Sequence, residues 1–74
     1  MTNILKTLGD LALYVKWGNI SRDYFGFSRA WIYQRLNGYD GNGNHCEFTE
    51  AQRETLKEAL NDLAGKLKTA AEEL

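Results

Sequence analysis

Positions 19–38 of this 74-residue chain read NISRDYFGFSRAWIYQRLNG, and they decide the expected fold. The leading asparagine can cap a short helix over 20–25, which Gly26 can end because glycine readily adopts the positive φ found just past a helix. After a tight turn, Ser28 can cap a second helix over 29–36, and the closing Asn-Gly pair can end it. The pattern predicts a helix-turn-helix over 19–38.

The apolar residues of this stretch are spaced to form one small junction that fixes the angle between the two helices. They are Ile20, Tyr24, Phe25, Phe27, Ile32 and Leu36. The side chains of the second helix that are then predicted to point outward are Arg29, Ala30, Tyr33 and Gln34. A helix-turn-helix that reads DNA needs such an outer face, free to enter the major groove.

The thirteen residues from Gly26 to Gly38 resemble the Gly-Val-Ser-x-x-Thr-Val-Ser-x-x-Leu-Asn-Gly run of lactose-repressor-type and lambda-repressor-like DNA-binding domains. The matching positions are Gly26, Ser28, Ile32, Leu36, Asn37 and Gly38. This resemblance implies DNA binding by the helix that follows Ser28. The whole chain also resembles an uncharacterised family of small bacterial proteins that share Tyr-Phe-Gly, Trp-hydrophobic-Tyr-Gln-Arg and a following Asn-Gly loop.

Three places depart from the regulator pattern. Ser21 and Arg22 stand where the first helix usually carries an apolar residue followed by alanine. Trp31 and Tyr33 are larger than the usual threonine and serine. Arg35 stands where many members have a buried aliphatic side chain, so either the helix is rotated or Arg35 extends to the surface.

Side-chain chemistry assigns eight residues to DNA contact. Arg29 and Gln34 carry planar heads suited to base edges, and Tyr33 can meet a phosphate or a thymine methyl group. The amide and hydroxyl of Ser28, at the positive end of a helix dipole, suit a phosphate. Ala30 belongs to the same outward face. The cations placed to flank the duplex are Lys16, Arg22 and Arg35.

The net charge of −1 opposes this interpretation, because phosphate neutralisation by lysine and arginine supplies most of the non-specific affinity for DNA. The charge is unevenly distributed, however. Residues 16–38 contain four basic residues and one acidic residue, whereas residues 39–74 contain eight acidic and four basic residues. We therefore expect the two halves of the chain to have opposite electrostatic faces, with the basic one in the middle of the chain.

The residues before the helix-turn-helix are also predicted to be helical. Apolar side chains from Ile4 to Val15 recur at steps of three and four, which predicts a helix capped by Thr2 or Asn3 and ended by Gly18. Because apolar side chains cover most of its circumference, we expect it to be a central helix contacted on several sides.

Residues 39–47 are rich in glycine and asparagine, which predicts a loop or a small hairpin turn. Thr49 and Gln52 form a capping box, with Phe48 as a staple residue, for a long helix over 49–74. With the elements described above, this gives a single all-α domain over residues 1–74, built from four helices around a central helix-turn-helix.

The C-terminal helix carries an apolar seam whose members step by four and three residues, as in a coiled coil. They are Leu56, Leu60, Leu63, Leu67, Ala70 and Leu74. The seam can pack on the first helix of the same chain, as in small bundles, or on the same helix of a second copy in a homodimer. A chain this short has a thin core, which favours some oligomerisation, and both arrangements stay open.

Several other functions are disfavoured. The single cysteine, Cys46, allows no intrachain disulfide, and with its neighbour His45 it provides too few ligands for zinc. The run from Asp40 to Asn44 resembles a calcium loop, but His45 and Ala51 stand where that loop needs glycine and glutamate. One histidine in a glycine-rich loop also gives no nucleophile with a positioned base. We expect no metal, no cofactor and no enzymatic activity.

The chain start lacks the features of a signal peptide, and no apolar run approaches the roughly 20 residues that cross a bilayer. We therefore expect a cytoplasmic protein without a membrane partner.

Two functions fit these observations. In the first, the chain is a homodimeric, sequence-specific protein that binds double-stranded DNA and regulates transcription, with the C-terminal helix forming the dimer. In the alternative, it is a helical protein-interaction or dimerisation module that binds no nucleic acid and exposes Trp17, Trp31, Tyr33 and Tyr39. DNA readout needs the outward face of the second helix to be exposed and unoccupied.

Overall fold

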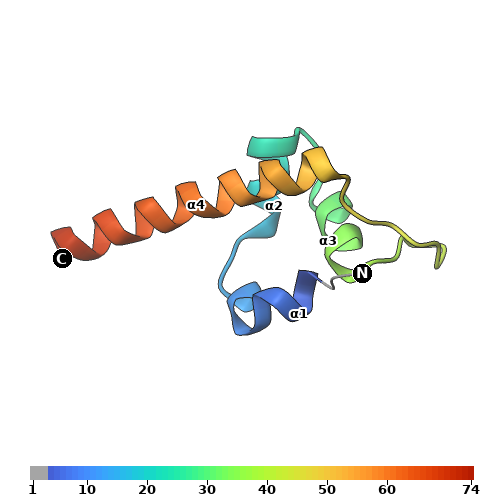
Figure 1. Ribbon diagram of the computed structural model, residues 1–74, viewed down its shortest axis with the longest axis horizontal. Helices are drawn as coiled ribbons and strands as arrows, with labels where there is room; N and C mark the ends of the chain where they lie inside the picture. The colour runs from blue at the N-terminus through green and yellow to red at the C-terminus, as the bar shows by residue number, and fades with distance from the viewer. Residues whose placement is uncertain (1–3) are drawn as a thin grey trace.

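The computed structural model describes residues 4–74, and within them the fold is all-α, as predicted. The elements, in chain order, are α1 (Ile4–Leu8), the 3-10 helix η1 (Gly9–Leu13), α2 (Trp17–Ile20), the π-helix η2 (Ser21–Phe25), α3 (Arg29–Asn37) and α4 (Glu50–Glu73). Figure 1 shows α4 lying across the shorter helices, with its C-terminal half projecting beyond them. This projection gives the molecule a long axis of 45 Å against 24 and 20 Å in the other directions.

α2 and η2 form one helical stretch over residues 17–25, which a three-residue turn joins to α3. Gly26 and Gly38, the two glycines predicted to end helices, have φ angles of 72° and 88°. The side chain of Ser28 caps α3 by accepting a hydrogen bond from the Trp31 amide at 3.3 Å. The predicted succession of helix, short turn and helix is therefore confirmed.

The start of this stretch differs from the prediction. The first helical residue is Trp17, so Asn19 lies inside α2 and does not cap it, and Gly18 lies inside a helix and does not end one. Trp17 is only 2% exposed, and its indole Nε1 donates to the Ala12 carbonyl at 2.9 Å. Burying an aromatic side chain of this size contributes about 4 kcal/mol, against about 1 kcal/mol for a side-chain cap. Burial of the tryptophan therefore decides where the helix begins.

The prediction of one continuous first helix is also wrong. Gly9 adopts a φ of 55°, and the chain continues as the short helix η1. As a result, Leu13 and Tyr14 are 85% and 82% exposed, so this segment is not a central helix. The periodic spacing could not reveal the break, because a glycine fits a helix and a left-handed bend alike. The cap predicted at Thr2 or Asn3 lies outside the described residues.

One hydrophobic core joins the turn region to α4. Its buried members are Val15, Trp17, Ile20, Ile32, Leu36, Phe48, Leu56 and Ala59. Three of the predicted junction residues belong to it, and Tyr24 and Phe25 pack against it half-buried. Phe27 is instead exposed, and its ring stacks on Trp31 with centroids 4.6 Å apart. The predicted junction is thus largely correct, except that Phe27 lies at its exposed edge.

The segment over 39–49 is a loop containing one isolated antiparallel bridge between Tyr39 and His45. The Asp40 carboxylate accepts hydrogen bonds from the amides of Asn42 and Asn44, at 2.8 and 3.0 Å. These bonds favour the charged carboxylate and lower the pKa of Asp40 below the usual aspartate value. The predicted loop is therefore a small turn organised by one aspartate.

α4 begins with the predicted capping box. The Thr49 hydroxyl accepts from the Gln52 amide at 3.1 Å, and the Gln52 side chain accepts from the Thr49 amide at 2.9 Å. Phe48, immediately before, is buried as the staple residue should be. The helix then continues to Glu73, which confirms the long C-terminal helix.

Only the first part of the apolar seam of α4 packs within the chain. Leu56 is buried, and Leu60 and Leu63 pack half-buried against the core. η2 holds this part of the helix through a 2.9 Å hydrogen bond from the Tyr24 hydroxyl to Asp62, which raises the pKa of Tyr24. The later seam residues are exposed. Packing within the chain therefore accounts for the first three of the six seam residues.

Candidate functional site

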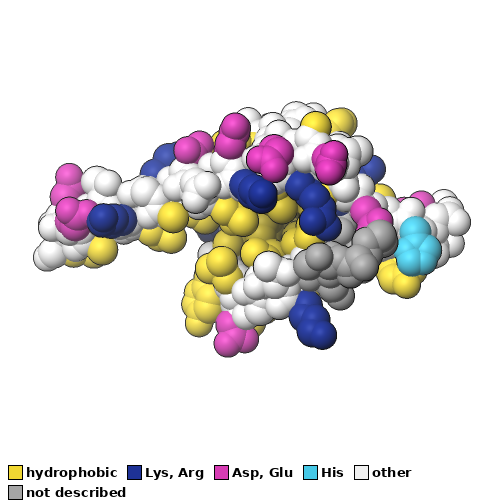
Figure 2. Space-filling model, viewed as in Figure 1, with side chains coloured by type: hydrophobic (Ala, Val, Ile, Leu, Met, Phe, Trp, Pro, Cys, Tyr) yellow, Lys and Arg dark blue, Asp and Glu magenta, His cyan; other side chains and the backbone are white. Residues whose placement is uncertain are grey.

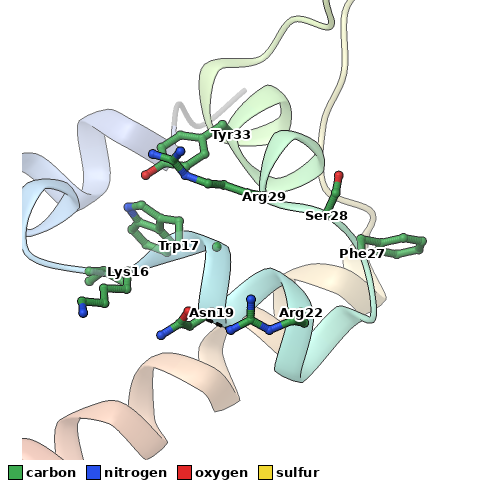
Figure 3. A pocket seen from close by; sticks show the side chains of 10 residues that line it. Lys16, Trp17, Asn19, Arg22, Phe27, Ser28, Arg29 and Tyr33 are labelled. Carbon is green, nitrogen blue, oxygen red and sulfur yellow. Dashed lines mark hydrogen bonds between the residues drawn. The ribbon is translucent and has the colours of Figure 1, made fainter.

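A concavity of about 420 Å³ opens between the start of α2 and the start of α3. The residues that line it are Val15, Lys16, Trp17, Gly18, Asn19, Arg22, Phe27, Ser28, Arg29 and Tyr33. Figure 3 shows Lys16, Asn19 and Arg22 on one side, and Arg29 and Tyr33 across from them. Five of the eight residues predicted to contact DNA therefore meet at one place.

The charge of this concavity is one-sided. Among the described residues that line it are three cations, Lys16, Arg22 and Arg29, and no acid. All three are exposed, so their heads remain hydrated and available to a ligand. The local positive charge seen in the sequence is thus concentrated around one hollow by the angle between α2 and α3.

Two neighbours orient the Arg22 head. Its Nη2 donates to the Asn19 side-chain oxygen at 2.9 Å, and its Nε lies 3.9 Å from an Asp23 carboxylate oxygen. The pair with Asp23 is exposed on both sides, and such pairs contribute little free energy in water. A phosphate group can therefore replace Asp23 as the partner of Arg22 at small cost.

Arg29 crosses the hollow and does not extend freely into solvent. Its Cγ and Cδ atoms would lie 3.3 Å from a Cβ placed on Gly18, so the missing side chain of that glycine makes room for them. Its guanidinium carbon lies 5.0 Å from the centre of the Tyr33 ring, one helical turn further along α3. Such a cation over an aromatic face is held in place by the charge distribution of the ring. The guanidinium is therefore presented beside Tyr33 with a preferred orientation.

Ser28 links the concavity to the turn. Its hydroxyl accepts the Trp31 amide as the cap of α3, and its backbone carbonyl accepts a 2.6 Å hydrogen bond from the Ser21 hydroxyl. Ser21 is completely buried, which explains how a polar residue can occupy a position that regulators usually fill with an apolar one. This bond fixes the start of α3 against η2.

The remaining three predicted contact residues lie outside the concavity. Ala30 is exposed and Gln34 is half-buried on α3. Arg35 packs its guanidinium 4.5 Å from the centre of the Trp31 ring, and its Nε is buried without a hydrogen-bond partner. It lines a separate hollow with His45 and Phe48. Arg35 therefore neither sits in the core as an aliphatic residue would nor flanks the basic concavity.

Sequence reasoning did not identify Gly18, Asn19 and Phe27 as part of the site. Gly18 gave the opposite signal, because a glycine after an apolar stripe suggests a helix end. The apolar pattern places Phe27 in the junction, although it lies in the turn, where side chains often remain exposed. Trp17 also lines the hollow while being buried, so it cannot belong to an exposed aromatic interaction surface.

Other chemistry is sparse in the described part of the chain. No group of three or more histidine, cysteine, aspartate or glutamate residues among residues 4–74 is arranged to hold a metal ion. The Cys46 thiol is free and half-buried. None of the helices over these residues combines the length and hydropathy of a bilayer-crossing segment.

Comparison with known proteins gives one result. The sequence model of a family described as "Domain of unknown function (DUF5053)" matches residues 4–74. Searches of curated proteins and of solved structures give no match.

Proposed function

The chain belongs to the DUF5053 family, and from its geometry we propose that it is a small regulator of transcription that binds double-stranded DNA at the basic concavity. The observation that supports this most is the gathering of Lys16, Arg22 and Arg29 around a hollow whose described lining holds no acid. Binding, without catalysis, is the proposed activity. We propose that the protein acts in the cytoplasm.

The proposed contacts follow from the position of each side chain. Lys16 and Arg22 lie on the α2 side and take two phosphates of the backbone. The first turn of α3, capped by Ser28, offers backbone amides to a third phosphate. These contacts set the position of the duplex and carry no sequence information.

The base-reading contacts come from the exposed side of α3. Arg29 reaches a guanine edge from its place beside Tyr33, and the small Ala30 lets the helix approach the groove floor. Gln34 can bond an adenine edge after a rotamer change, since it is half-buried in the free protein. Arg35 has no place in this scheme because its head packs on Trp31.

A salt titration of binding to a random-sequence 20-base-pair duplex tests the proposal, with fluorescence anisotropy as the readout. Neutralisation of phosphates makes the logarithm of the affinity fall linearly with the logarithm of the salt concentration. Lys16→Ala and Arg22→Ala should each reduce this slope by about 1, because each removes one phosphate contact. Lys68→Ala is the matched control, since Lys68 is an exposed lysine on the projecting part of α4.

The result that would overturn the proposal is an absence of binding at 50 mM salt, or a slope that Lys68→Ala lowers as much as Lys16→Ala does. Sequence specificity has its own test, selection of bound duplexes from a random pool. Arg29→Ala should relax the preference at one base position by about 1–3 kcal/mol, and should leave the salt slope nearly unchanged if it contacts a base. A pool that shows no enrichment would leave only non-specific binding.

A further inference from the structure

The C-terminal half of α4 has an apolar face that no other part of the described chain, residues 4–74, covers. Leu67 is 61% exposed and Leu74 fully exposed, although both continue the seam that Leu56 begins in the core. Figure 2 shows hydrophobic side chains along the lower edge of the projecting helix. Covering these exposed leucines removes apolar surface from water, so this segment gains free energy from a partner.

The charges of this segment are arranged in two blocks. Lys66 and Lys68 lie near its start, and Glu72 and Glu73 lie at its end. A second copy aligned in parallel would place like charges side by side. A second copy aligned antiparallel would place the basic block of each helix beside the acidic block of the other, which is favourable at both ends.

We propose that residues 63–74 of α4 pair antiparallel with the same residues of a second copy of this chain. The seam spacing fixes the register: Leu67 packs beside Ala70 of the second copy, and Leu63 packs beside its Leu74. One flank then places Lys66 opposite Glu73 of the second copy. Because the pair has two-fold symmetry, each of these contacts occurs twice.

The other flank of the same register supports close packing. It brings Ala64 of one copy opposite Ala71 of the other, and again the contact occurs twice. Two alanines at facing positions let the helix backbones approach closely. The Lys66–Glu73 pair lies on one side of the seam and the Ala64–Ala71 pair lies on the other. The register therefore gives favourable contacts on both sides of the seam.

The rest of the domain adds a receiving surface at the end of the pair. Leu63 and the exposed Tyr14 line one hollow of about 360 Å³, together with Ile20, Tyr24 and Ala59. Since Leu74 of the second copy lies beside Leu63, it enters this hollow and covers the Tyr14 ring. The exposure of Tyr14 created by the break at Gly9 is thereby explained. This proposal does not depend on DNA binding.

Sedimentation equilibrium of the full chain over micromolar to millimolar concentrations tests the pairing. We expect a weak dimer, because two short helices bury less surface than a standard interface. Lys66→Glu should weaken association at least fivefold by placing two glutamates together, and the double variant Lys66→Glu, Glu73→Lys should restore it. Lys68→Glu is the matched control. It reverses one charge as Lys66→Glu does, but at a position that does not face the second copy, so it should weaken association less.

A monomer at every concentration would overturn the proposal. A dimer that Leu67→Glu leaves intact would also overturn it, since Leu67 lies at the centre of the seam and is exposed in the single chain. A Lys66→Glu variant that dimerises as well as the original would exclude the antiparallel register. Circular dichroism of each variant establishes that the helical domain itself is folded.

Discussion

The buried hydroxyl of Ser21 provides the sharpest test of how the turn is held. Ser21 has no exposed surface, and its Oγ donates to the Ser28 carbonyl at 2.6 Å. Ser21→Ala removes this donor and leaves the carbonyl without it. A typical hydrogen bond contributes about 1 kcal/mol net, and the Ser28 carbonyl left without its donor in a partly buried place adds to this loss. We therefore expect the free energy of unfolding to fall by about 1–2.5 kcal/mol.

Urea unfolding followed by circular dichroism at 222 nm measures this change. The slope with denaturant should stay the same, because the folded and unfolded surfaces are unchanged. In a thermal experiment, a loss of 1 kcal/mol corresponds to a drop in Tm of about 4–8 °C for a domain of this size. Thr69→Ala, which removes an exposed hydroxyl from α4, is the matched control. A loss below 0.5 kcal/mol for Ser21→Ala would refute the reasoning that this bond fixes the start of α3.

Three further substitutions and one titration have expected outcomes. Gly26→Ala should destabilise the fold by about 1–2 kcal/mol because the backbone at this position has a positive φ. Gly65→Ala, in open space within α4, should stabilise the fold by about 1 kcal/mol. Urea unfolding of both variants checks that the free energy of unfolding falls in the first and rises in the second. Thr49→Ala should cost about 0.5–2 kcal/mol by removing the cap of α4, and an unchanged Tm would contradict the capping box. The carboxyl of Asp40 should titrate below the usual aspartate range in a carbon-detected NMR experiment. Its stabilising effect on the loop should be fully present above the ordinary aspartate pKa and should be lost as the pH falls through the lowered pKa. A normal titration would exclude the turn described for this loop.

The parts of the fold that the sequence predicts correctly depend on neighbours along the chain. The Ser28 cap, the left-handed glycines at 26 and 38 and the capping box at Thr49 each need only a few adjacent residues. Local chemistry decides these features, since each residue type has few alternatives at a helix end.

The parts that it does not predict depend on contacts between distant segments. The π-helix η2 ends in a turn that Ser21 bonds across, and the helix start at Trp17 depends on burial of that side chain against the core. The break at Gly9 is of the same kind, because only the packing of the following residues selects a bend over a straight helix.

The candidate site shows the same division. The outward cations could be named from the sequence, but their meeting at one hollow depends on the angle between α2 and α3 and on the space that Gly18 leaves for Arg29. Arg35 lies away from this hollow for a related reason: its guanidinium packs on Trp31, four residues earlier, and a charge count cannot reveal that contact.

The π-helix η2 also determines where the chain tolerates a change in length. The amides of Gly26 and Phe27 both donate to the Ser21 carbonyl, which lies five and six residues earlier in the chain. The turn that these hydrogen bonds close therefore contains one residue more than the turn at the end of a regular α-helix. A relative that lacks one residue between Trp17 and Gly26 could close the same turn as a regular α-helix. A deletion between Gly26 and Ser28 has no such alternative, because those residues provide the left-handed bend and the cap. We therefore expect single-residue length differences within the family to fall in η2 and not in the turn that follows it.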